Sequence, residues 1–241
     1  GYADESKHTG TELVYTQSAG YTYDGFKEYR CDICGNTYIT DIVKAKGLPK
    51  PTVTATNDAA TGRTILNWTH DGESEYYAIY RATSKSGKYS LVDTVECGPW
   101  MDNTASVGKT YYYKVKACVE ISDYNSSYSS VVSAATKCAA PTLAVSAGST
   151  GKPVLTWNKI SGAKKYEIWR SVDGATFKKL TTTTKLTYTD SKATAGANCA
   201  YKVKALGSSS SYNGSFSNTG SSIVCTKKTY PFAVFPLLRL S

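Results

Sequence analysis

Alternating apolar and polar residues define a series of short strands beyond residue 50. In the stretch 50–140 the alternation predicts strands at about 52–56, 63–69, 76–82, 89–95, 100–105, 110–118 and 128–136. Turn residues such as Asp71-Gly72 and Ser86-Gly87 separate them. About seven short antiparallel strands within roughly 90 residues predict a two-sheet sandwich.

The same pattern occurs twice. Thr64–Trp68 (TILNW) returns as Pro153–Trp157 (PVLTW), and Tyr113–Ala117 (YKVKA) returns as Tyr201–Ala205 (YKVKA). The two tryptophans are 89 residues apart, and the first tyrosines of the later motif are 88 apart. A repeat of this length carries its own core, so it indicates two copies of one domain rather than a solenoid of short units.

These observations predict an all-β chain of four parts. Two tandem seven-stranded, immunoglobulin-like sandwiches occupy residues 50–140 and 141–229. Residues 1–49 do not match the repeat and predict a small β-hairpin module, with a tight turn at Cys31–Cys34 and too few residues for a core of its own. An apolar tail occupies residues 230–241.

Composition and charge narrow the function classes. The chain of 241 residues has a net charge of +9, but its 28 Lys and Arg residues are scattered without a long basic run, which argues against nucleic acid as the partner. A diffuse positive surface still attracts polyanions in a salt-dependent way.

The sequence contains no apolar stretch of about 18 residues, so we expect no membrane insertion. Gly1–Asp4 is similar to the start of a mature secreted chain.

The repeated positions resemble the fibronectin type III family over about 50–140 and 141–228. The residues that carry the resemblance are the second-strand tryptophans, the third-strand tyrosines, the sixth-strand Tyr-x-Val motifs and the glycines before them: Trp68, Trp157, Tyr77, Tyr166, Tyr113, Val115, Tyr201, Val203, Gly108 and Gly196. The resemblance implies a tyrosine corner at the sixth strand. Ala105 and Ala193 stand where the family usually has Leu.

The N-terminal module is similar to small Cys-x-x-Cys-Gly segments that precede such domains in surface proteins of gut Gram-positive bacteria. Together the two resemblances imply a secreted or cell-surface protein of bacterial origin. They imply adhesion, interaction or spacing as its role. Protein or glycan at a cell surface is then the expected partner, and the oligomeric state stays open.

The seven cysteines are an odd number, so one is left over in any full pairing. Cys97 and Cys118 are both absent from the second repeat, and Cys199 and Cys225 are both absent from the first. Strand ends at the same pole of a sandwich lie close together, so we expect the disulfides Cys97–Cys118 and Cys199–Cys225, with Cys138 left over. Buried free thiols are the alternative.

Cys31 and Cys34 form the sharpest chemical motif, Cys-x-x-Cys-Gly. A knuckle of this kind points two thiolates at one ion, as in a structural zinc site, and His8 is a candidate third ligand. Residues 1–49 offer no evident fourth ligand. A local disulfide is the equal alternative, whereas a redox-active pair lacks the βαβ context of thioredoxin-like proteins.

Catalysis finds no support in the sequence. The chain has two histidines, His8 and His70, and His70 falls at a predicted turn. There is no glycine-rich phosphate loop and no arrangement of Ser, His and Asp typical of hydrolases. We therefore expect a protein that is not an enzyme.

Candidate binding residues come from the outer sheet faces. Period-two alternation predicts that Tyr80, Tyr112, Lys114 and Lys116 point outward in the first repeat, and Trp169, Lys202 and Lys204 in the second. Exposed aromatic rings beside donors can stack on sugars or anchor a protein partner. Cross-strand pairs that only stabilise the sheet are the alternative. The predicted function is an extracellular adhesion, interaction or spacer module, with a carbohydrate-binding accessory region of a glycan-degrading enzyme as the alternative.

Overall fold

The computed structural model describes residue 10, residues 12–217 and residues 221–224. The candidate zinc ligand His8, the predicted disulfide partner Cys225 and the predicted tail 230–241 lie outside these residues. None of the described helices is long and apolar enough to cross a membrane.

The regular secondary structure of the described chain is almost entirely β-strand, as predicted, and the chain divides into two compact units. One unit holds Gly1–Thr56, Thr64–Asp102 and Thr110–Ala134, and the other holds Asn57–Arg63, Asn103–Lys109 and Ala135–Ser241. Three segments of the first repeat are thus grouped with the second unit. The boundaries expected from the sequence, at 49/50 and 140/141, stay predictions.

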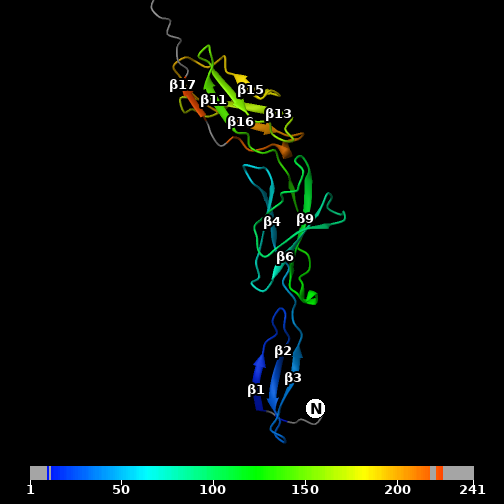
Figure 1. The fold of residues 1–241 in the computed structure, drawn as a ribbon. Coiled ribbons are helices and arrows are strands. Elements are labelled where there is room, and N and C mark those ends of the chain that lie inside the picture. Colours follow the sequence, from blue (N-terminus) through cyan, green and yellow to red (C-terminus); the bar gives the residue numbers. More distant parts are fainter. Residues whose placement is uncertain (1–9, 11, 218–220, 225–241) are drawn as a thin grey trace, which may run out of the picture. The chain divides into compact units, whose positions relative to one another are not determined.

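The N-terminal module is a three-stranded antiparallel sheet rather than a hairpin. Its strands are β1 (Glu12–Gln17), β2 (Gly25–Arg30) and β3 (Thr37–Val43), which lie side by side in blue in Figure 1. Strand β1 escaped prediction because its sequence, ELVYTQ, does not alternate cleanly. It is a strand because it pairs antiparallel with β2, from Glu12 opposite Arg30 to Gln17 opposite Phe26.

The first repeat folds into two sheets. One sheet has the order β4-β5-β8 and the other β10-β9-β6-β7. The strands are β4 (Val53–Asn57), β5 (Thr64–Trp68), β6 (Tyr76–Ala82), β7 (Ser90–Val95), β8 (Trp100–Met101), β9 (Thr110–Cys118) and β10 (Val132–Ala135). Figure 1 shows β6 and β9 side by side, in agreement with their antiparallel pairing.

The second repeat has the same two-sheet arrangement. Its sheets have the orders β11-β12-β15 and β14-β13-β16-β17. The strands are β11 (Leu143–Ala147), β12 (Pro153–Trp157), β13 (Lys165–Val172), β14 (Lys178–Thr183), β15 (Thr187–Thr189), β16 (Asn198–Leu206) and β17 (Ser221–Val224). The predicted pair of all-β sandwiches is confirmed, because each repeat builds a three-stranded and a four-stranded sheet.

Equivalent residues fill the two cores. Tyr113 and Val115 on β9 are fully buried, as are Tyr201 and Val203 on β16. The predicted equivalence of the tryptophans also holds: Trp68 packs on Tyr77 with ring centroids 5.4 Å apart, and Trp157 packs on Tyr166 at 5.6 Å. Both indole N–H groups are buried, and neither has a hydrogen-bond acceptor among the residues that the structure describes. The repeat in sequence is therefore a repeat in packing.

Two predicted strands are shorter than expected. The strand expected at 100–105 is limited to Trp100–Met101, and the strand expected at 128–136 begins only at Val132. The residues before Val132 leave the ladder because serine side chains take part of its hydrogen bonding: Ser129 Oγ accepts from the backbone N–H of Val115 at 3.0 Å. Ser126 Oγ accepts from Ala117 in the same way, at 2.9 Å.

Candidate interaction surface

In the second sandwich, lysines and aromatic rings form a cluster on the outer face of β13 and β16. The ammonium of Lys202 lies 4.1 Å from the ring centroid of Phe216, 4.4 Å from that of Phe177 and 5.6 Å from that of Trp169. Lys204 lies 5.4 Å from Phe216. Each contact is within the range in which a ring quadrupole attracts a cation. The prediction that Trp169, Lys202 and Lys204 share this face is confirmed.

The first sandwich has the same cluster at equivalent positions. Lys114 lies 4.2 Å from the ring centroid of Tyr89 and 5.5 Å from that of Tyr128, and Lys116 lies 5.8 Å from Tyr128. Tyr80 meets Tyr128 edge to face, with centroids 5.1 Å apart. Trp169 meets Phe216 in the same geometry at 5.5 Å. We call these two groups the lysine–aromatic clusters; their members are Tyr80, Tyr89, Lys114, Lys116 and Tyr128 in the first sandwich, and Trp169, Phe177, Lys202, Lys204 and Phe216 in the second.

Tyr112, the remaining predicted binding residue, is half-buried on β9 opposite Ala82. It lies two residues from Lys114 and therefore on the same outer face. Its phenol is close enough to Tyr89 to raise the pKa of that residue, although burial of Tyr89 is the larger cause.

Serine hydroxyls hold in place the loops that contain Tyr128 in the first cluster and Phe216 in the second. Ser129 follows Tyr128 and Ser217 follows Phe216; Ser217 Oγ accepts from the backbone N–H of Val203 at 3.2 Å. The backbone N–H of Ser217 also donates to the carbonyl of Val203 at 2.8 Å. The side-chain hydroxyl and the backbone N–H of Ser217 thus both attach the loop to β16, and they hold the ring of Phe216 next to the lysines.

The second cluster includes one carboxylate. Glu167 accepts from Lys179 Nζ at 2.6 Å and from the indole N–H of Trp169 at 3.3 Å. The hydrogen bond from Lys179 lowers the pKa of Glu167, and the charge of Lys204 adds to this effect. In the first sandwich the equivalent of Glu167 is Ala78, so this acidic group belongs to the second cluster only.

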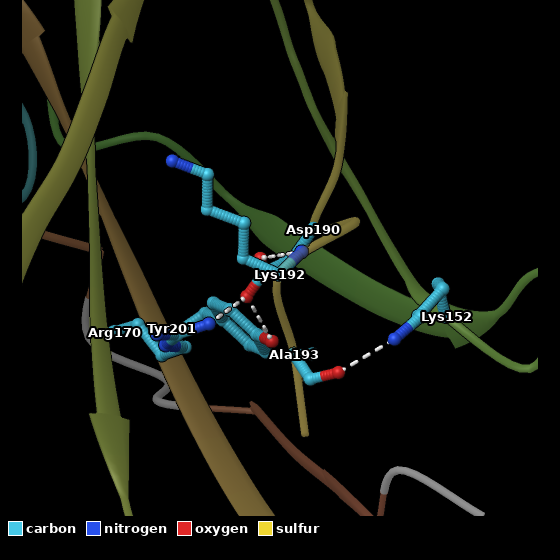
Figure 2. A network of polar contacts seen from close by, with 6 residues as sticks. All are labelled: Lys152, Arg170, Asp190, Lys192, Ala193 and Tyr201. Carbon is cyan, nitrogen blue, oxygen red and sulfur yellow. Dashed lines mark hydrogen bonds and ion pairs between the residues drawn. The ribbon is translucent and has the colours of Figure 1, made fainter. Parts of the chain in front are cut away.

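A buried polar network lies on the inner side of the same sheets. In the second sandwich, Arg170 and the hydroxyl of Tyr201 both donate to Asp190 Oδ2, at 2.7 and 2.9 Å, and Figure 2 shows both side chains converging on that carboxylate. Arg81, Tyr113 and Asp102 repeat the network in the first sandwich, at 2.6 and 2.9 Å. Both aspartates are fully buried, so each network ties the two sheets of a sandwich together.

These networks engage the hydroxyl of one sixth-strand tyrosine in each sandwich. The hydroxyls of Tyr113 and Tyr201 each donate to a buried carboxylate. Burial raises the pKa of both phenols far above its ordinary value, and the neighbouring aspartate adds to the rise. The tyrosines remain protonated donors at neutral pH, which is suited to a structural bridge and not to proton transfer.

The predicted Cys97–Cys118 disulfide is not formed, and this corrects the sequence analysis. Both residues are free thiols; Cys97 is exposed and Cys118 is buried. Cys97 follows the end of β7 and Cys118 ends β9, and strand β6 lies between these two strands, so they are separated by two strand spacings of roughly 4.8 Å each. A disulfide needs Cα atoms within about 7 Å. The sequence analysis placed both cysteines at the same end of the sandwich, but that position alone does not bring them within bonding distance.

The other cysteine predictions stay open. Cys199 is buried on β16 opposite Ile223, and its predicted partner Cys225 lies outside the described residues. Cys138, the expected leftover, is fully buried, and burial raises the pKa of its thiol. Cys31 is buried and Cys34 is exposed on the turn between β2 and β3.

The described residues do not complete a metal centre. Within residues 10, 12–217 and 221–224, no three or more His, Cys, Asp or Glu side chains gather where they could hold a metal ion. Cys31 and Cys34 supply two thiols, fewer than the four ligands of a structural zinc site. With His8 outside the described residues, the zinc and local-disulfide alternatives both stay predictions.

Comparison with known proteins gives fold similarity but no sequence family. No family model and no curated protein matches the sequence. The structure is similar to that of the chicken interferon gamma receptor alpha chain, with 15% sequence identity, a TM-score of 0.51, and coverage of 73% of this chain and 98% of the receptor chain. A segment of two fibronectin type III domains from chicken tenascin also matches, with 14% identity, a TM-score of 0.43, and coverage of 72% and 95%.

The fold is fibronectin type III-like. At 15% identity the likeness to the receptor chain establishes the arrangement of strands and nothing about a ligand. The fibronectin type III-like fold expected for the two repeats is therefore confirmed, whereas bacterial origin and the Cys-x-x-Cys module are not addressed by either match.

Sequence reasoning missed the four loop aromatics of the clusters, Tyr89, Phe177, Tyr128 and Phe216. In the structure they lie just before or between strands, although the predicted strands 89–95 and 128–136 begin at Tyr89 and Tyr128. A signal was nevertheless present, because Asn125-Ser-Ser-Tyr-Ser129 returns as Asn213-Gly-Ser-Phe-Ser217 at the same offset of 88 residues as the sixth-strand motif.

Proposed function

We propose that this chain is a non-enzymatic extracellular interaction module in which two fibronectin type III-like sandwiches present the lysine–aromatic clusters to a partner. The observation that carries the proposal is the repetition of a cationic, partly exposed outer face at equivalent positions of both sandwiches. The secreted or surface location and the bacterial origin are part of this proposal, and they are supported by the sequence resemblance alone.

The clusters support interaction through charge better than through open aromatic faces. A neutral sugar stacks on an accessible ring, whereas Trp169 already has Lys202 over its ring at 5.6 Å and Phe216 packed nearly perpendicular to it. All three side chains are half-buried. Carbohydrate binding by ring stacking, as expected of an accessory region, therefore gains no specific observation from the structure, and adhesion through the cationic groups is the better-supported function.

A bead assay tests the proposal. The full chain is coated on fluorescent beads, which are presented to intact cells and to immobilised mucin. Removing one lysine from each cluster, as Lys116→Gln with Lys204→Gln, should reduce bead binding severalfold. The control, Lys159→Gln with Lys185→Gln, changes net charge equally at exposed positions outside the clusters and should leave binding unchanged. Beads that bind none of these surfaces would contradict the proposal.

A further inference from the structure

We infer that the outer face of β13 and β16 in the second sandwich is a docking surface for an acidic polysaccharide. This inference rests on the proposed function and gives its partner a chemical class. The described part of the chain offers a row of cations here, while the rings beside them are already engaged.

The row is set by sheet geometry. Lys202 and Lys204 are two residues apart on β16, so they point to the same face about 7 Å apart. Lys165 of β13 pairs with Leu206, the next outward position along β16, and its side chain is exposed. The positions of three lysines therefore follow the direction of β16, the third one strand over on β13, and this spacing suits a linear chain of anionic groups.

A fourth cation flanks this row. Lys179 on β14 is nearly half exposed and bonds to Glu167, whose partner across the sheet is Lys204. Four lysines and one glutamate leave the face with a net charge of +3. The glutamate also sets the affinity, because it competes with any incoming anion for Lys179 and Lys204.

The aromatic residues favour a polysaccharide over a nucleic acid. Single-stranded nucleic acids gain affinity by stacking bases on open rings. In this cluster Lys202 lies against three rings, and Trp169 packs edge to face on Phe216. Recognition at this face must then come from the ammonium groups, which bind carboxylates or sulfates without reading a base.

Titration calorimetry of the full chain provides the test, with heparin and polygalacturonate as sulfated and carboxylated probes. Dextran serves as the neutral polymer and a DNA duplex as the competing anion. We expect both acidic polysaccharides to bind, with affinity falling as salt rises, and dextran not to bind. Binding of the DNA duplex at equal or higher affinity would overturn the polysaccharide assignment.

Three variants locate the surface. Lys165→Gln with Lys204→Gln should weaken binding about fivefold, since each exposed ion contact contributes a modest share. Lys159→Gln with Lys185→Gln removes the same charge elsewhere and should change affinity less than about twofold. Glu167→Gln should tighten binding about twofold, an effect that damage to the fold cannot produce.

Equal weakening by the two double variants, or no tightening by Glu167→Gln, would overturn this docking surface. If the beads bind cells while neither acidic polysaccharide binds, the proposed function stands and the partner class is wrong. If the beads bind nothing while both polymers bind at the predicted face, the docking surface stands and the adhesive function is wrong.

Discussion

The two sandwiches differ at the entry of the sixth strand, where the first has Tyr111 and the second has Cys199. In the first sandwich the guanidinium of Arg81 lies 4.8 Å from the ring centroid of Tyr111. In the second sandwich a small buried thiol occupies that position, next to the equivalent Arg170. The Arg–Asp–Tyr network persists through this change. The comparison indicates that the two sandwiches share the Arg–Asp–Tyr network, whereas the residue that packs beside its arginine, Tyr111 or Cys199, differs between them.

The outer faces of the two sandwiches also differ, in the residues that lie beside the lysine–aromatic clusters. Both retain two lysines over aromatic rings, but the second adds Glu167 and Lys179 where the first has Ala78 and Leu91. Leu91 is 54% exposed, so the first face is more apolar beside its cluster and the second is more ionic. Duplicated domains with one interior and two different surfaces are consistent with separate contacts for each copy.

Removing the buried carboxylate of either network should cause the largest loss of stability in the sandwich that contains it. Asp190→Ala leaves Arg170 and Tyr201 without their shared acceptor and should cost the second sandwich about 3–5 kcal/mol. Asp102→Ala should cost the first sandwich a similar amount. Hydrogen exchange on β13 and β16, and separately on β6 and β9, measures each loss. Lys192→Ala, beside Asp190 but exposed, is the control; a loss under about 1 kcal/mol for either aspartate would show that the networks are not structural equivalents.

Removing the loop serine should have the next largest effect. Ser129→Ala leaves the buried N–H of Val115 without its side-chain acceptor and should destabilise the first sandwich by about 1–3 kcal/mol. Ser217→Ala should act similarly through Val203. Urea denaturation measures both losses, with the exposed neighbours Ser127→Ala and Ser215→Ala as controls. Controls as damaging as the serine variants would refute the anchoring role.

Alkaline pH should weaken both sandwiches together. The pKa of Tyr113 and of Tyr201 is raised in the folded state, so above about pH 10 the unfolded chain loses protons that the folded chain retains. Stability is therefore fully present below pH 10 and falls as the pH rises, by up to about 1.4 kcal/mol per pH unit for each tyrosine. Urea midpoints at about pH 8 and pH 11 measure the fall. The double variant Tyr113→Phe with Tyr201→Phe should fall less steeply; an unchanged slope would exclude these residues as the cause.

Loss of a single cluster lysine should have the smallest effect. Lys202→Met keeps the aliphatic stem but removes the cation over three rings, and it should cost about 0.5–1 kcal/mol. Lys114→Met should cost no more, since Lys114 contacts two rings. Thermal unfolding measures both changes, with Lys159→Met as the exposed control. A larger loss for Lys114 than for Lys202 would reverse the order expected from the ring contacts.

Particular residues show how far prediction from sequence reached. Alternation correctly assigned Tyr77, Ile79, Tyr113 and Val115 to the interior, because a strand has a strict period of two. It also placed Lys202 and Lys204 on the outer face. It could not connect Arg170 to Asp190, since these residues lie on different sheets and only the packing of one sheet on the other brings them within 2.7 Å.

The sequence by itself determined that the chain is a duplicated all-β protein, because hydrophobic periodicity and repetition are local and recur at a constant offset. The tertiary structure decided which residues meet across strands and sheets. Strand order separates Cys97 from Cys118 by placing β6 between them, and loop anchoring brings Phe216 over Lys202. Both outcomes depend on contacts between segments far apart along the chain, which a local pattern does not encode.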